Sequence, residues 1–242
     1  PYLLNLASAD QSLHRRSILA LSLDMKRAEQ LGARYVVTHL GSAKERGRAF
    51  GLKRVVEALR AVWDQNSPVS LLLENSSGAG NSVGVFFEEF QEIIQRLGND
   101  GRVGICFDSC HGFAAGYDFR STEKTETLVR KMDRTIGLTR LALIHLNDCA
   151  GSLGAHLDRH QHIGKGKIGL GGFRALLSHP VLRMIPLILE TPKKTPRDDL
   201  RNLSRVRRLL RGEETGWEKG KEGPACPRMV DDDERRITGN ER

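Results

Sequence analysis

Five apolar stretches of the chain each end in a side chain that can bind a metal ion. Their terminal residues stand 35, 34, 37 and 45 positions apart, and they are His39, Glu74, Asp108, His145 and Glu190. In a parallel α/β barrel the carboxyl ends of the strands form one face, so the five side chains are expected to converge. Buried carboxylates repel one another unless a cation lies between them. The pattern therefore predicts a metal cluster, although any one such residue alone is more often a hydrogen-bonded core residue or a helix cap.

Two local motifs add donor atoms beside these strand ends. Asp108 and His111 lie three positions apart in FDSCHGF, so one loop offers a carboxylate and an imidazole. Asp158 and His160 are separated by one residue, which in extended backbone places both side chains on the same face. Nitrogen and oxygen donors of this kind favour zinc, with manganese or iron as alternatives. Metal ions roughly 3.5–4 Å apart are suited to stabilising attack and departure at a phosphodiester.

Other polar residues are weaker candidates for a site. Four histidines are expected to pack or to face solvent rather than bind metal, namely His14, His156, His162 and His179. Three basic residues either contact phosphate or belong to an exposed loop, namely Arg159, Lys165 and Lys167. The segment GKGKIGLGG lacks the spacing of a nucleotide-binding phosphate loop. We interpret its glycines as allowing the backbone to approach a ligand closely.

Strands and helices alternate along the chain, and this order must position the donors. The first helix is expected to open at the N-cap Asp10 and to end before Gly32. Further helices are expected at about residues 52–64, 85–97, 122–136, 173–177 and 197–210. Alternating β and α units predict a parallel sheet covered by helices. We expect an incomplete TIM (β/α)8-type barrel with about five of eight βα units, over residues 1–210, followed by a disordered tail at 211–242.

Composition and charge limit the class of protein. Apolar residues make up 39% and charged residues 28% of the 242, which is typical of a soluble globular protein. The net charge is +8, with residues 211–242 contributing −2, so the remainder carries +10. Such a basic body fits a nucleic-acid partner, or simply a basic enzyme. No membrane span or signal peptide is expected, and the four cysteines lack a disulfide-like spacing, which favours a cytoplasmic location.

Long motifs in the chain resemble those of the endonuclease IV family, the TIM-barrel apurinic/apyrimidinic endonucleases of base-excision repair. The matching segments, over about residues 1–210, are YLLNLAS, THLGS, LLENSSGAGNSVG, CFDSCHGFAAGYD, HLNDCAGSLGAHLDRHQHIGKGKIG and ILETP. The resemblance implies a monomeric enzyme with three Zn²⁺ ions, for which Mn²⁺ is a possible substitute. Its implied partner is double-stranded DNA containing abasic sites. A metal-activated hydroxide would hydrolyse the phosphodiester 5′ to the lesion and leave a 3′-OH, with no protein nucleophile.

The resemblance also implies a role for each matching residue. Glu74 corresponds to the carboxylate that bridges two zinc ions, and we expect it also to orient or deprotonate the attacking water. His39 would bind the first zinc, and the second would be bound by Asp108, His145 and Glu190. The ligands implied for the third zinc are His111, Asp158 and His160. Tyr2 and Leu3 match a loop that inserts into the duplex at the lesion, or else they pack on the barrel rim, and Arg159 is a candidate DNA contact.

One departure from the family pattern and two alternative functions remain at this point. The family carries a further zinc-ligating histidine two residues before the position of Pro1, so the first zinc would have only two protein ligands here. We therefore expect the 242-residue chain alone to be weakly active or inactive. A xylose-isomerase-like sugar isomerase or epimerase is one alternative, and it would not need the third metal site. An inactive truncated fragment that binds DNA or metal without turnover is the other.

Overall fold

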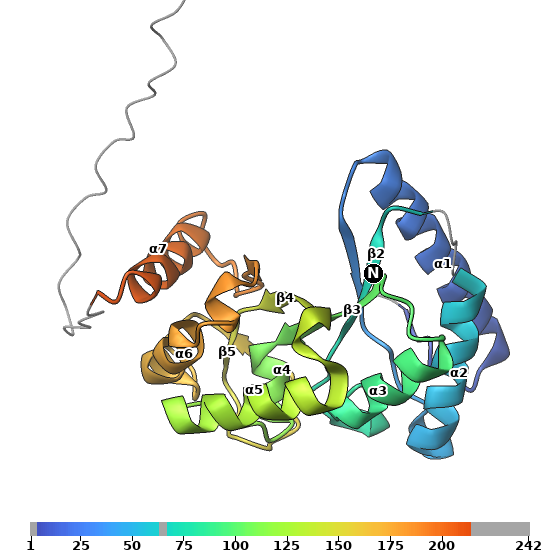
Figure 1. Ribbon diagram of the computed structural model, residues 1–242, viewed down its shortest axis with the longest axis horizontal. Coiled ribbons are helices and arrows are strands. Elements are labelled where there is room, and N and C mark those ends of the chain that lie inside the picture. The colour runs from blue at the N-terminus through green and yellow to red at the C-terminus, as the bar shows by residue number, and fades with distance from the viewer. Residues whose placement is uncertain (1–3, 63–66, 214–242) are drawn as a thin grey trace, which may run out of the picture.

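The structure, a computed structural model, describes residues 4–62 and 67–213, whose strands form one main parallel sheet (Figure 1). In spatial order the strands are β1 (Tyr35–Thr38), β2 (Ser70–Glu74), β3 (Val103–Asp108), β4 (Leu141–His145) and β7 (Leu187–Ile188). Each strand pairs with the next one in parallel register. Spatial order therefore follows chain order, as in a barrel wall. The described residues form a TIM-barrel-like half-barrel, which confirms the predicted fold class.

Helices lie along the outer side of this sheet in an arc that runs from α1 to α6 in Figure 1. The α-helices of the described residues are α1 (Gln11–Gln30), α2 (Gly47–Val62), α3 (Phe87–Arg96), α4 (Ser109–Ala114), α5 (Thr122–Ile136), α6 (Gly169–Ser178) and α7 (Asp198–Leu210). Short 3₁₀ turns occur at Lys44–Arg46, Ala79–Asn81, Leu138–Arg140 and Leu182–Met184. The predicted start of α1 is confirmed, because the Asp10 carboxylate accepts the Leu13 N–H at 2.8 Å.

Alternation along the strands separates two apolar clusters. Leu71, Leu73 and Phe107 belong to the large core between the sheet and the helices. Leu72 and Cys106 point to the opposite face and form a small second cluster, which corresponds to the inside of the barrel wall. Because successive strand residues face opposite sides, a strand such as β3 buries both faces, and this explains the near-continuous apolar runs in the sequence.

Several element boundaries differ from the sequence-based expectations. β1 ends one residue before His39, and β7 ends two residues before Glu190, so both predicted strands were too long. α2 and α6 begin earlier than predicted, at Gly47 and Gly169. The short helix α4 and the antiparallel pair β5 (Asp148–Cys149) and β6 (His160–Gln161) were not predicted at all. These elements carry weak periodicity because they are shorter than two helical turns or only two residues long. The predicted tail lies outside the described residues from position 214 onward.

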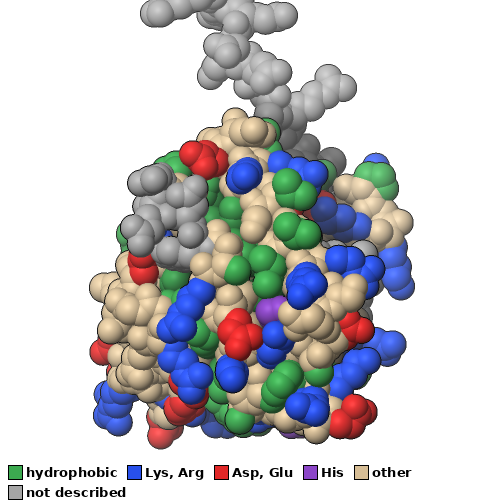
Figure 2. Space-filling view, turned by 90° about the vertical axis from the view of Figure 1, so that its right-hand side faces the viewer, with side chains coloured by type: hydrophobic (Ala, Val, Ile, Leu, Met, Phe, Trp, Pro, Cys, Tyr) green, Lys and Arg blue, Asp and Glu red, His purple; other side chains and the backbone are tan. Residues whose placement is uncertain are grey.

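The surface on the side of α1 and α2 is rich in basic side chains (Figure 2). Lys and Arg are spread over this face and interleaved with Asp and Glu, rather than gathered in one patch. Within the described residues, every helix is too short or too polar to span a lipid bilayer.

Candidate metal centre

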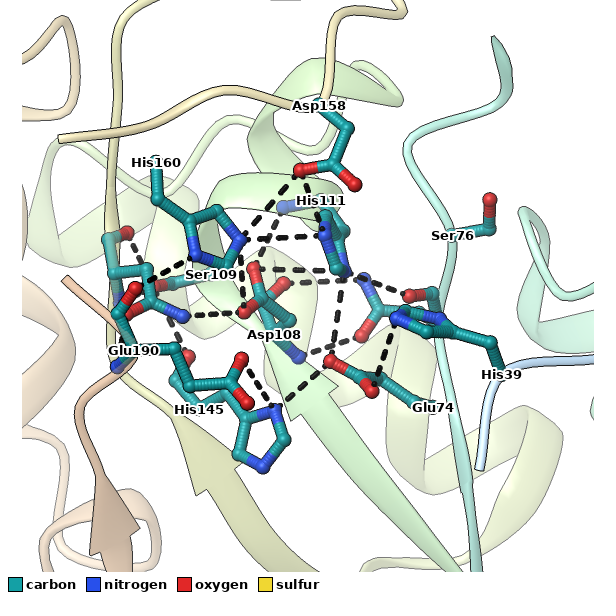
Figure 3. Close-up of polar contacts among 12 residues, drawn as sticks. His39, Glu74, Ser76, Asp108, Ser109, His111, His145, Asp158, His160 and Glu190 are labelled. Atoms are coloured by element: carbon teal, nitrogen blue, oxygen red, sulfur yellow. Dashed lines mark hydrogen bonds and ion pairs between the residues drawn. The ribbon is translucent and has the colours of Figure 1, made fainter. Parts of the chain in front are cut away.

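The eight predicted metal ligands lie together at the carboxyl ends of the strands (Figure 3). Among the described residues, potential ligand atoms form five groups, and within each group they lie within 4.8 Å of one another; two of these groups include Cys106 or Cys110. The other three consist only of predicted ligands. These three groups are His39, Glu74 and His111; Glu74, Asp108, His145 and Glu190; and His111, Asp158 and His160. The sheet register explains part of this convergence, because Asp108 pairs with His145 across β3 and β4.

The cluster has a buried floor and an exposed rim. Glu74, Asp108 and His145 form the floor, with side chains 0–6% exposed. Asp158 and Glu190 stand at the rim, with side chains 55% and 46% exposed. A ligand therefore reaches the donor atoms from the rim side, where the loops that follow the strands lie.

Glu74 sits between two of the groups. Its Oε2 lies 3.4 Å from Nε2 of His39, and its Oε1 lies 2.8 Å from Nδ1 of His145. The same Oε1 is 3.6 Å from Nδ1 of His111. One carboxylate thus offers an oxygen to each side, which is the geometry that a bridging ligand needs.

Hydrogen bonds to backbone carbonyls determine which ring nitrogen of His111 and of His160 lacks a proton in the neutral ring. Nδ1 of His111 lies 3.1 Å from the carbonyl oxygen of Asn75, so it carries the proton and leaves Nε2 unprotonated in the neutral ring. Nε2 of His111 faces Asp158 at 3.2 Å. Likewise, Nδ1 of His160 donates to the carbonyl oxygen of Glu190 at 3.1 Å, and its Nε2 faces the Asp158 carboxylate at 3.6 Å. The unprotonated Nε2 atoms of His111 and His160 therefore both lie in the third group, together with Asp158.

Comparison of the sequence and the fold with known proteins identifies the family of this chain. Residues 1–214 match the family model described as Xylose isomerase-like TIM barrel. A protein of Methanoculleus marisnigri named "Probable endonuclease 4" is 46% identical over 211 residues, which are 86% of this chain and 75% of that protein. The chain belongs to the endonuclease IV family. The crystal structure of endonuclease IV from Thermus thermophilus has a TM-score of 0.73 at 36% identity, over 87% of this chain and 74% of that one.

Solved structures with other names share the architecture at lower sequence identity. A D-tagatose 3-epimerase-like protein matches with a TM-score of 0.68 and 21% identity, over 87% of this chain and 74% of that one. At this identity the likeness shows the fold alone. Membership of the endonuclease IV family therefore rests on the closer sequence matches, as the motifs in the sequence indicated.

The carboxylates of this endonuclease IV-like cluster create a strongly negative field around its histidines. Burial opposes protonation of His111, but the surrounding carboxylates, Asp108 first, outweigh it and raise its pKa from 6.5 to about 10. Burial also opposes protonation of His145, whose pKa is nevertheless raised by hydrogen bonds with Cys106 and then Glu190. The field thus draws protons onto the imidazoles, and a metal ion would satisfy the same field.

The remaining predicted site residues lie outside the three groups. Arg159 is exposed in the loop just before β6, where its carbonyl oxygen accepts the Ala150 N–H at 2.9 Å. Tyr2 and Leu3 lie outside the described residues. The four other histidines contact groups away from the cluster, as expected. His14 contacts the Arg54 carbonyl and His156 contacts the Ser77 carbonyl. His162 contacts the Asn202 side chain, and His179 contacts the Glu126 carboxylate.

Three buried polar residues next to the cluster were missed at the sequence level. Asn75 follows Glu74 directly and brackets the backbone of Asp108, accepting its N–H at 2.6 Å and donating to its carbonyl at 3.1 Å. Asn147 and Asp148 follow β4 in the motif HLND. Their position directly after strands that end in donors was the available signal.

Asp148 explains the glycine-rich segment. Its buried carboxylate accepts backbone N–H groups from Gly166, Ile168 and Cys149 at 2.8–3.0 Å, and a longer one from Gly169 at 3.4 Å. A side chain at Gly166 would overlap this carboxylate. The close approach that Gly166 allows is therefore to Asp148 of the same chain, and at this position it corrects the expected approach to a ligand.

We expect Asp148→Ala to lower the free energy of unfolding by about 2–4 kcal/mol, because several buried N–H groups lose their acceptor. Asp148→Asn keeps one acceptor oxygen and should lose about half as much. Urea unfolding measures both values, and trypsin cleavage after Lys165 and Lys167 reports the order of the loop. An alanine variant with wild-type stability and wild-type trypsin resistance would show that the carboxylate does not hold this loop.

Proposed function

We propose that this protein is a zinc-dependent DNA-repair endonuclease that hydrolyses the phosphodiester 5′ to an abasic site and leaves a 3′-OH. The observation that carries the proposal is the convergence of eight nitrogen and oxygen donors into three adjoining groups, which are three of the five donor groups among the described residues. Membership of the endonuclease IV family supports the substrate, and the basic body of the chain suits a polyanion.

The donor set fits zinc. It combines imidazole nitrogens with carboxylate oxygens, which are common zinc ligands. Glu74 and Asp108 are 4% and 0% exposed, and their ion-pair partners are histidine side chains. Such buried carboxylates are costly to desolvate unless a cation compensates them. When bound, zinc in these groups would lower the pKa of a coordinated water and offset negative charge on the phosphate and the leaving oxygen.

The protein's own residues would organise the reaction around this centre. Glu74 spans the first and second groups and is placed to orient the attacking water at the buried floor. Asp158 and His160 stand on the rim side, where the scissile phosphate would be held. Hydrolysis forms a bond from water oxygen to phosphorus and breaks the bond to the 3′-oxygen, which takes up a proton. No side chain needs to form a covalent intermediate.

The sugar isomerase alternative accounts for less of the site. A one- or two-metal isomerase would use the groups around Glu74, and it leaves the third group without a purpose. The structure places donor atoms of His111, Asp158 and His160 within 4.8 Å of one another. This observation favours the nuclease.

Single-turnover cleavage tests the proposal, because an excess of protein over substrate makes even slow cleavage detectable. With excess zinc-loaded protein, we expect a labelled duplex with one tetrahydrofuran abasic analogue to be nicked on its 5′ side, while the undamaged duplex stays intact. Metal analysis of the same sample should approach three zinc ions per chain. Absence of nicking together with one or two metal ions per chain, and turnover of a ketose, would establish the isomerase instead.

A further inference from the structure

We propose that Asn147 is a positioning residue that fixes two ligands of the proposed metal centre, Asp108 and Glu190, relative to each other. The proposal rests on the proposed function, because it assigns Asn147 a role toward bound metal. Asn147 itself is 0% exposed and lies one residue beyond Leu146, where the chain leaves β4.

The side chain of Asn147 joins the two ligands directly. Its Nδ2 donates to Oδ2 of Asp108 at 2.6 Å, and its Oδ1 accepts the backbone N–H of Glu190 at 2.7 Å. The orientation of the amide is fixed by its partners, since the Glu190 N–H can only donate and the Asp108 carboxylate can only accept. The amide therefore links Asp108, which lies 39 positions before it in the sequence, to Glu190, which lies 43 positions after it.

The backbone of Asn147 is anchored as well. Ser109 Oγ accepts the Asn147 N–H at 2.8 Å and lies 2.7 Å from the Asn147 carbonyl oxygen. Ser109 is the first residue of α4, directly after Asp108. The link is therefore rigid at its base, and the amide cannot swing away from Asp108 without breaking contacts at both ends.

Glu190 needs this contact because it lies beyond its strand. The sheet ladder ends when Leu146 donates its N–H to the Ile188 carbonyl at 2.8 Å, two residues before Glu190. From there the backbone of Glu190 is held by Asn147 on its N–H and by His160 on its carbonyl. The Asn147 amide thus takes the place of the missing ladder bond and fixes the backbone position from which the Glu190 side chain extends.

Asp108 is similarly constrained by Asn147. Its Oδ1 accepts the His111 N–H at 2.8 Å, which caps α4, and Asn147 holds the other oxygen. Each oxygen keeps a second lone pair for a metal ion. Outer hydrogen bonds of this kind orient metal ligands, and their loss typically lowers metal affinity about 10–100-fold.

The test compares metal affinity with stability in matched variants. Asn147→Ala removes the amide and leaves a cavity, while Asn147→Leu removes both hydrogen bonds but keeps most of the volume. Asn202→Ala is the control, because Asn202 is equally buried and donates to Thr191 Oγ1 and the Asp198 carbonyl without touching Asp108 or Glu190. Zinc affinity is measured by competition with a chromophoric chelator, and Co²⁺ absorption reports the ligand geometry.

We expect both Asn147 variants to bind the zinc of the group that contains Asp108 and Glu190 about 10–100-fold less tightly and to show an altered Co²⁺ spectrum. The control should lose comparable thermal stability while keeping its zinc affinity close to that of the wild-type chain and its spectrum unchanged. Wild-type affinity and spectrum in Asn147→Leu, or equal affinity losses in Asn147→Ala and Asn202→Ala, would overturn the positioning role. If the wild-type chain itself binds no zinc, the proposed function fails, and with it the basis of this inference.

Discussion

Replacing Glu74 by glutamine is expected to slow cleavage of an abasic duplex about 10²–10³-fold, the size of effect seen when a single preorganised electrostatic contact at a reacting centre is lost. The amide keeps the shape of the side chain but loses the charge and one oxygen donor. Because Glu74 belongs to both the first and the second donor groups, one substitution weakens two metal positions. Single-turnover nicking and metal content are the two measurements, and zinc per chain should fall together with the rate.

Glu89→Gln provides the matched control for this substitution. Glu89 is also a buried glutamate, 7% exposed, and its Oε2 accepts the backbone N–H groups of Val85 and Phe86 at the start of α3. The amide oxygen of glutamine can still accept both bonds, so we expect only a small loss of stability and no change in zinc content. Equal rates and equal zinc content in Glu74→Gln and the wild-type chain would exclude a bridging role for Glu74.

Zinc is expected to raise the thermal stability of the protein strongly. A ligand that binds only the folded state at about a thousand times its dissociation constant adds about 4 kcal/mol per site. For a chain of this size, that corresponds to a rise in Tm of about 10 °C for each site. Mg²⁺, which prefers oxygen ligands in octahedral geometry, should give a smaller shift and serves as the control. A Tm that is the same after chelation and after zinc loading would contradict a metal centre.

The zinc-induced stabilisation should also grow as pH rises towards about 10, the raised pKa of His111 in the metal-free fold. In the metal-free protein the pKa of His111 is raised from 6.5 to about 10, so its protonated form stabilises the fold fully below pH 6.5, and this contribution is lost as pH rises through about 10. Zinc requires the neutral imidazole, so binding must release that proton at neutral pH. Each released proton adds about 1.4 kcal/mol of zinc stabilisation per pH unit. Calorimetry in buffers of different ionisation enthalpy counts these protons directly, and a buffer-independent enthalpy would contradict the raised pKa.

The sequence alone determined the framework of the site. Strand-length apolar runs at intervals of 34 to 45 residues indicate parallel βα units, and parallel strands bring their carboxyl ends to one face. His39, Glu74, Asp108 and His145 could therefore be predicted to converge without any knowledge of contacts. The helix at 122–136 was also correct in both boundaries, because a Ser121 cap and Gly137 mark its ends.

Only the tertiary structure decided how the donors are oriented and held. The protonated nitrogen of His111 depends on the carbonyl of Asn75, 36 positions away, and the position of Glu190 depends on Asn147, 43 positions away. Such hydrogen bonds join side chains to backbone groups across different strands, so they follow from sheet register and loop geometry rather than from local spacing. The glycine-rich segment shows the same limit, because its amides bind the buried carboxylate of Asp148. The local sequence determines the spacing of the strand ends that carry the donor residues. The packing of loops that are distant in the sequence determines which atoms of those residues face one another.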